Sequence, residues 1–102
     1  MITVELTNDE ALVLFEFLSR EIDETQEKRL AQVIDHPAEF WALNSVHCAL
    51  EKILREPFAG NYRELLALSR EKVIAQCDPE GTYVLSAASE PDHGGPGRRS
   101  NP

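Results

Sequence analysis

Three stretches of this chain repeat apolar residues every three or four positions, the spacing that gives an amphipathic helix one apolar side. The first stretch follows a capping box, in which Thr7 and Glu10 can satisfy each other's backbone N–H groups. The second begins at Pro37, because proline suits the first position of a helix. The third begins at Asn61, which forms a weaker capping pair with Glu64. The pattern predicts three helices, over residues 8–23, 37–55 and 62–76.

The apolar residues of each helix define the side that we expect to pack into the core. On the first helix this side is formed by Ala11, Leu14, Phe15, Leu18 and Ile22. On the second helix it is formed by Ala42, Leu43, Val46, Ala49, Leu50, Ile53 and Leu54. On the third helix it is formed by Tyr62, Leu65, Leu66, Val73 and Cys77. Residues 28–34 are expected to form a short helical piece that turns inward Leu30, Val33 and Ile34.

Two short segments have the composition of β-strands. Residues 2–6 alternate apolar and polar side chains, and residues 82–86 are rich in residues that favour strands. The two segments can pair within one chain or between two copies, with the helices beneath them, because an isolated ribbon is marginal in water. The predicted fold is therefore mostly α, a small antiparallel three-helix bundle with or without this two-stranded β edge.

We expect residues 1–86 to form a single helical domain. Residues 87–102 are rich in Ser, Pro, Gly and charged residues and are predicted to be a disordered tail, because they cannot bury enough apolar surface to become ordered. Arg98 and Arg99 lie in this tail. They are expected to be solvated rather than paired with the acidic first helix, since an exposed ion pair is worth less than the ordering of a tail costs.

The negative charge of the chain is concentrated at one end. The net charge is −8, and residues 1–27 account for nearly all of it, because their only base is Arg20. Their acids are Glu5, Asp9, Glu10, Glu16, Glu21, Asp23, Glu24 and Glu27. A concentrated acidic surface repels phosphate and attracts cationic partners. The expected partner is therefore a basic protein or a second copy of the chain, as a monomer or homodimer, and not a nucleic acid.

Nothing in the sequence predicts a membrane or secretory protein. The longest apolar run, residues 11–15, is far shorter than the ~20 residues that span a bilayer. The first residues lack the basic start and apolar core of a signal peptide. Cys48 and Cys77 are too few for a disulfide framework. We expect a cytoplasmic protein with reduced cysteines.

The sequence shows no motif for catalysis, for a metal or for another cofactor, and we expect none. His36, His47, His93 and the cysteines lack the spacing that puts two metal ligands on one helix face. The four glutamates Glu16, Glu21, Glu24 and Glu27 look like a solvated face. The catalytic alternative is a small enzyme in which His47 activates Cys48 or Cys77, but a Cys77 that faces the core would be inert.

Two apolar groups stand off the predicted core sides. Val13 and Phe17 lie one turn apart on a second face of the first helix, and exposed aromatic residues in a polar rim are typical of binding hot spots. The rim of this predicted binding face is Glu10, Arg20, Glu21 and Glu24. Trp41 and Cys48 form a secondary patch on the second helix. For Trp41 we favour burial under the preceding polar segment, whereas for Val13 and Phe17 cover and exposure are equally open.

Two parts of the chain resemble a group of small uncharacterised bacterial proteins. One is the capped acidic helix in residues 6–20, and the other is the Glu-Pro-Phe sequence at residues 56–58 followed by Tyr62. The resemblance covers residues 2–75. It implies no activity and no site residues, because no activity is established for the group.

These observations favour a non-catalytic interaction or regulatory module that docks a basic partner or associates with itself. An antitoxin or immunity protein fits this description. A nucleic-acid mimic is a further alternative, but eight acids on one short element are sparse beside duplex phosphates, which recur about every 1.7 Å of axis.

Overall fold

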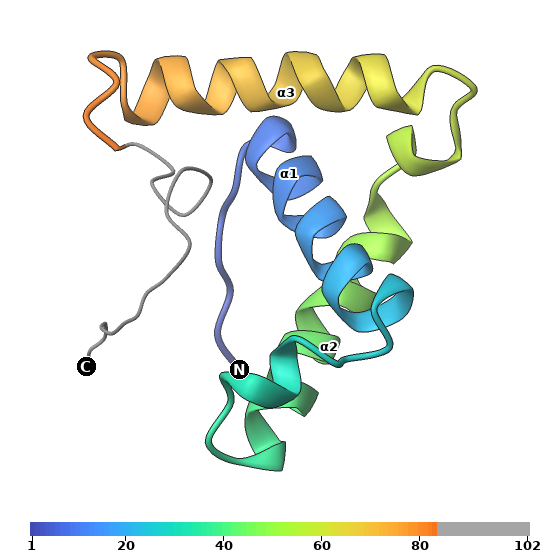
Figure 1. Ribbon diagram of the computed structural model, residues 1–102. Helices are drawn as coiled ribbons and strands as arrows, with labels where there is room; N and C mark the ends of the chain where they lie inside the picture. The colour runs from blue at the N-terminus through green and yellow to red at the C-terminus, as the bar shows by residue number, and fades with distance from the viewer. Residues whose placement is uncertain (84–102) are drawn as a thin grey trace.

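A computed structural model of the chain describes residues 1–83, and Figure 1 shows a small helical fold. The three main helices are α1 (Asn8–Ser19), α2 (Pro37–Ile53) and α3 (Tyr62–Cys77). Shorter turns connect them: the π-helix η1 (Arg20–Glu24) and the 3-10 helices η2 (Leu30–Gln32) and η3 (Glu56–Phe58). The predicted three-helix fold is confirmed.

Helix α1 is the central element, because it packs against both other helices. In Figure 1, α3 lies across the N-terminal end of α1, and α2 packs against the C-terminal part of α1. The core consists of two apolar clusters along α1. The first is built from Leu12, Phe15, Leu54 and Leu66, and the second from Leu18, Ile22 and Leu30.

The helix starts follow the sequence signals to different degrees. The capping box of α1 is present: the Glu10 N–H donates to Thr7 Oγ1 at 3.0 Å, and the Thr7 N–H donates to Glu10 Oε1 at 2.9 Å. Helix α2 begins at Pro37 as predicted, and the Ala38 N–H donates to His36 Nδ1 at 3.0 Å. Asn61 precedes α3, but its side chain makes no capping hydrogen bond.

The first predicted helix does not continue regularly to residue 23. After Ser19 the chain widens into the π-helix η1, where the Thr25 N–H donates to the carbonyl of Arg20 at 3.0 Å. Gln26 and Glu27 then have positive φ angles of 53° and 66°, a conformation that non-glycine residues adopt infrequently. This sharp reversal sends the chain back toward α2, where Leu30 enters the core.

Several predicted core positions are wrong. Leu12 was not assigned to the core, yet it has no exposed surface. Of the predicted side of the second helix, Leu54 at the C-cap of α2 is buried and Leu43 and Leu50 are partly buried, whereas Ile53 is 74% exposed. Cys77 is exposed, as is Val33 of the short connecting piece. The reason for the errors on α2 is that α1 covers only one narrow side of it, along Phe40, Leu43, His47 and Leu50.

The predicted β edge is not formed in the described part of the chain. Residues 1–7 have no strand partner, and residues 82 and 83 form no strand. Residues 84–86 of the second predicted strand lie outside the described residues. The predicted tail, with Arg98 and Arg99, also lies outside them.

Candidate functional site

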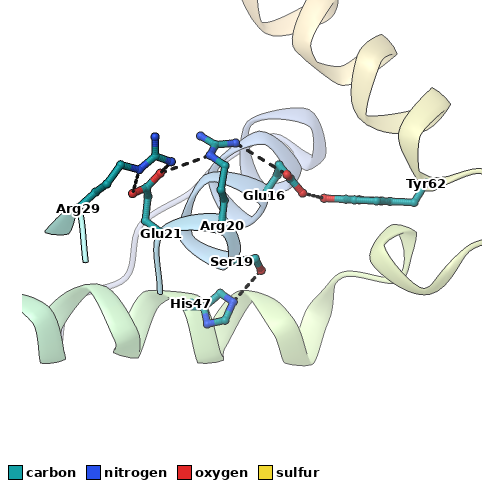
Figure 2. A network of polar contacts seen from close by, with 7 residues as sticks. All are labelled: Glu16, Ser19, Arg20, Glu21, Arg29, His47 and Tyr62. Carbon is teal, nitrogen blue, oxygen red and sulfur yellow. Dashed lines mark hydrogen bonds and ion pairs between the residues drawn. The ribbon is translucent and has the colours of Figure 1, made fainter. Parts of the chain in front are cut away.

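A network of charged side chains and one tyrosine lies along the acidic side of α1 and η1, and Figure 2 shows its members. Glu21 accepts two hydrogen bonds from the guanidinium of Arg29, one of them at 3.0 Å from Nε. Arg20 lies between two carboxylates, 3.4 Å from Glu21 and 3.8 Å from Glu16. The Tyr62 hydroxyl donates to Glu16 Oε1 at 2.7 Å. This network therefore connects the turn after η1 to η1, η1 to α1, and α1 to α3.

This network changes the status of two acids. Glu21 is only 6% exposed, so the expectation that it belongs to a solvated face is wrong. Glu16 is also mostly covered, and the pKa of Tyr62 is raised by burial, by its hydrogen bond to Glu16 and by the negative charge of that carboxylate. Glu16 and Glu21 thus serve the fold, because their charges are compensated inside the molecule.

The Glu-Pro-Phe segment at residues 56–58 contacts the start of α1. Asn8 Nδ2 donates to Glu56 Oε2 at 2.8 Å, and this hydrogen bond is the main cause that lowers the pKa of Glu56. Ser69 on α3 donates to Asp9 Oδ1 at 2.7 Å. Both contacts fix the N-terminal end of α1 and use the side chain of Asp9 within the fold.

The apolar part of the predicted binding face is divided. Val13 is half-buried against the first core cluster, whereas Phe17 is 43% exposed. The guanidinium carbon of Arg20 lies 5.5 Å from the centre of the Phe17 ring, which covers one face of that ring. Glu10 completes the capping box and lies 3.9 Å from Cys77 Sγ. Most of this predicted face therefore has a structural task.

Three acids past the end of α1 differ from those in the network. Asp23, Glu24 and Glu27 are exposed on η1 and the turn that follows it. Among residues 1–83, Asp23 lies 3.9 Å from His47 Nε2, and neither Glu24 nor Glu27 forms an ion pair with another side chain. Glu24 and Glu27, together with the largely exposed carboxylate of Asp23, are therefore accessible to a partner.

Next to these acids lies a pocket of about 530 Å³ between η1 and the start of α2, here named the aromatic pocket. Its apolar wall is formed by Ile22, Ile34, Pro37, Phe40 and Trp41. Its polar lining is formed by Asp23, Glu27 and Asn44. Trp41 is 62% exposed, so the prediction that the polar segment covers it is wrong. Its ring meets that of Phe40 edge to face at 5.0 Å.

The sequence alone did not predict this pocket. Trp41 was singled out as an off-core residue, and Asp23 and Glu27 were counted among the acids. The signal that joins them is the sharp reversal at Gln26 and Glu27, because it folds residues 22–27 onto residues 34–44. No local pattern in the sequence announces two consecutive positive φ angles at non-glycine residues.

The residues proposed for thiol catalysis do not come together. His47 is buried, stacks on Phe15 at 5.1 Å, and its Nε2 lies 2.9 Å from Ser19 Oγ. Asp23 approaches the same nitrogen. A nucleophile–histidine–acid triad uses the two ring nitrogens separately, so this cluster lacks that geometry. Cys48 and Cys77 are free and exposed, and neither is hydrogen-bonded to His47 in the part of the chain described.

Comparison of the chain with protein-family models, with curated proteins and with solved structures finds no match. The resemblance to small bacterial proteins therefore stays a prediction, and no residue role comes from a relative. Within residues 1–83, no helix is long and apolar enough to cross a membrane. The same residues contain no group of three or more His, Cys, Asp or Glu side chains placed to hold a metal ion.

Proposed function

We propose that this protein is a non-catalytic interaction module that docks a basic protein at the acidic region past the end of α1. The observation that carries the proposal is the contrast between compensated and uncompensated carboxylates. Glu16 and Glu21 are neutralised by Arg20 and Arg29, while Asp23 and Glu27 line the aromatic pocket and the exposed Glu24 lies next to Asp23 on η1. Such a surface steers a cationic partner and gives it an apolar contact.

The proposed contact lies further along the chain than the face that the sequence predicts. The sequence predicts a binding face centred on Val13 and Phe17, but Val13 is half-buried against the first core cluster and Arg20 lies over the Phe17 ring. The proposed contact is centred on Glu24, with Asp23 and Glu27. Proteins that neutralise a basic partner, such as antitoxins and immunity proteins, belong to the functional class that this proposal describes, and a cytoplasmic location suits it.

The test is a comparison of two charge reversals with the same change in net charge. Glu24→Lys alters the proposed contact, and Glu51→Lys alters an exposed acid on α2 outside it. Each variant and the wild-type chain captures proteins from cells of the source organism, and the captured basic protein is identified and purified. Its affinity is then measured by calorimetry at low salt and at about 0.5 M salt.

We expect Glu24→Lys to weaken binding about fivefold at low salt, the effect of roughly 1 kcal/mol of surface electrostatics. Glu51→Lys should weaken binding less than half as much, and high salt should reduce the difference. Equal affinities for the two variants, or binding that is indifferent to salt, would contradict the proposal.

A second candidate is self-association through α2, for which a separate observation speaks. Ala42, Val46, Ala49 and Ile53 follow one another at helical spacing on α2, and all are exposed. An apolar side of this kind can pair with itself about a two-fold axis. It also avoids the repulsion that a dimer through the acidic α1 would create.

Analytical ultracentrifugation tests the second candidate. We expect a concentration-dependent dimer for the wild-type chain and a monomer for the Val46→Glu variant. The matched control is Leu68→Glu, which places the same charge at an exposed leucine of α3. A wild-type chain that stays monomeric at all concentrations, or a dimer that survives Val46→Glu, would exclude this interface.

A further inference from the structure

We propose that the aromatic pocket binds an arginine side chain of the basic partner. The inference rests on the proposed function, because it names the group that the partner inserts and the place where it lies. The pocket has a volume of about 530 Å³, within the range of roughly 300–1,000 Å³ that holds small ligands in proteins.

The walls of the pocket suit the two parts of such a side chain. Ile22, Ile34 and Phe40 offer an apolar surface to a methylene stem. Trp41 offers an indole ring that is largely exposed, and indole is the best of the aromatic rings for a cation stacked on its face. The stem and the planar head of an arginine therefore find different surfaces in one pocket.

The charge of the pocket has one sign. Asp23 and Glu27 are its carboxylates, and no lysine or arginine is among the described residues that line it. Lys28 and Arg29 follow Glu27 in the sequence, but neither lines the pocket, and Arg29 is bound to Glu21 in the charge network. A cation in the pocket thus meets two carboxylates without displacing a basic side chain from the lining.

Arginine suits this arrangement better than lysine. Its guanidinium is planar, is more weakly hydrated than an ammonium group, and presents five N–H donors that can reach two separate carboxylates while the plane stacks on an aromatic ring. The ammonium group of lysine is a compact, strongly hydrated charge that loses more on leaving water. The expected order of binding is therefore arginine, then lysine, then a neutral side chain of the same shape.

The experiment uses three small probes on the full chain: the N-acetyl amides of arginine, lysine and citrulline, at constant ionic strength. Trp41 is the only tryptophan of the chain, so its fluorescence reports directly on the pocket. We expect saturable binding of the arginine probe with a dissociation constant of about 1–10 mM. The lysine probe should bind several times more weakly, and the citrulline probe should bind most weakly of the three, because it lacks the charge.

Two double variants separate the pocket carboxylates from net charge. Asp23→Asn with Glu27→Gln should weaken the arginine probe about fivefold, because two surface carboxylates lose their charge. Glu5→Gln with Glu51→Gln removes the same charge from exposed positions outside the pocket and should change the affinity less than twofold. Glu27→Gln alone tests the same point without touching the contact between Asp23 and His47. Circular dichroism confirms the fold of each variant.

Several results would overturn the assignment. If citrulline binds as well as arginine, the pocket does not recognise charge. If lysine binds as well as arginine, the pocket does not recognise the guanidinium group. A Trp41 spectrum that changes in Arg98→Gln with Arg99→Gln, without any probe, would place this chain's own arginines in the pocket instead of a partner's.

Failure here is distinguishable from failure of the proposed function. A basic partner that depends on Glu24 but leaves Trp41 fluorescence unchanged would keep the acidic contact and reject the pocket. Trp41→Leu in complex with that partner gives the same answer by calorimetry. The affinity of the Trp41→Leu variant for the partner should be about fivefold lower than that of the wild type, because the cation–π contact is lost while the apolar wall is kept.

Discussion

Helices α1 and α2 are both amphipathic, but they are used very differently. Helix α1 buries Leu12, Phe15 and Leu18, lies against both other helices and has its start and its acids satisfied by hydrogen bonds. His47 is the one buried residue within α2, and much of the apolar surface of this helix is exposed. The difference shows that an apolar pattern indicates how much surface a helix can bury, whereas the number of neighbours decides how much it does bury.

The acidic side chains also divide into two groups, those paired within the fold and those exposed to solvent. Acids that lie within reach of an arginine are drawn into ion pairs, as Glu21 of η1 is with Arg29 of the turn that follows it. Glu24 lies on the same short helix η1 as Glu21, but it is exposed and forms no ion pair within residues 1–83. The position of the arginines therefore decides which acids of η1 serve the fold and which remain on the surface for a partner.

The largest expected effect compares a leucine of α1 with an isoleucine of α2. Leu12→Ala should lower the free energy of unfolding by about 3 kcal/mol, because it leaves a cavity in a fully buried site. Ile53→Ala removes similar apolar volume from a largely exposed side chain and should cost less than about 0.5 kcal/mol. Urea denaturation of the monomer, followed by circular dichroism, measures both.

Equal losses for the two variants would mean that α2 is covered in solution. A loss for Ile53→Ala that grows with protein concentration would assign that cover to a second copy of the chain. Either result would reduce the contrast between α1 and α2.

A smaller effect is expected where α1 meets α3. Tyr62→Phe removes the hydrogen bond to the half-buried Glu16 and should cost roughly 1–2 kcal/mol near neutral pH. The pKa of Tyr62 is raised in the folded chain, so the hydroxyl stabilises the fold fully below its ordinary value of 10.0 and progressively less above it. The difference between wild type and Tyr62→Phe should therefore shrink between about pH 8 and about pH 11.

Tyr83→Phe is the matched control, because Tyr83 is exposed. Its free energy of unfolding should equal that of the wild type at both pH values. If the difference in free energy of unfolding between wild type and Tyr62→Phe stays constant or grows with alkaline pH, the pKa of Tyr62 is not raised by burial against Glu16.

The smallest effect compares the starts of the two helices. Thr7→Ala breaks the capping box of α1 and should cost about 1 kcal/mol. His36→Ala removes the side-chain hydrogen bond to the Ala38 N–H at the start of α2 and should cost about 0.5 kcal/mol, because Pro37 still favours the helix start. Thermal unfolding of both variants gives the comparison, and a larger loss for His36→Ala would reverse the ranking of the two helices.

Local signals in the sequence predicted the helices well and their faces unevenly. The capping box at Thr7 and the proline at residue 37 gave the starts of α1 and α2, because these signals act within one turn of the chain. Leu12 was missed because α1 has neighbours on two sides, and one apolar stripe cannot describe a helix that is covered twice. The candidate site was predicted only in its acidic character.

The sequence by itself determined the three helices and an acidic N-terminal quarter, since helix starts and charge depend on residues close together in the chain. The tertiary structure alone decided which acids are compensated and which stay exposed. It also decided that Trp41 lines a pocket with Asp23 and Glu27. The physical reason is that ion pairing and burial depend on distances in space, and the reversal after η1 sets those distances.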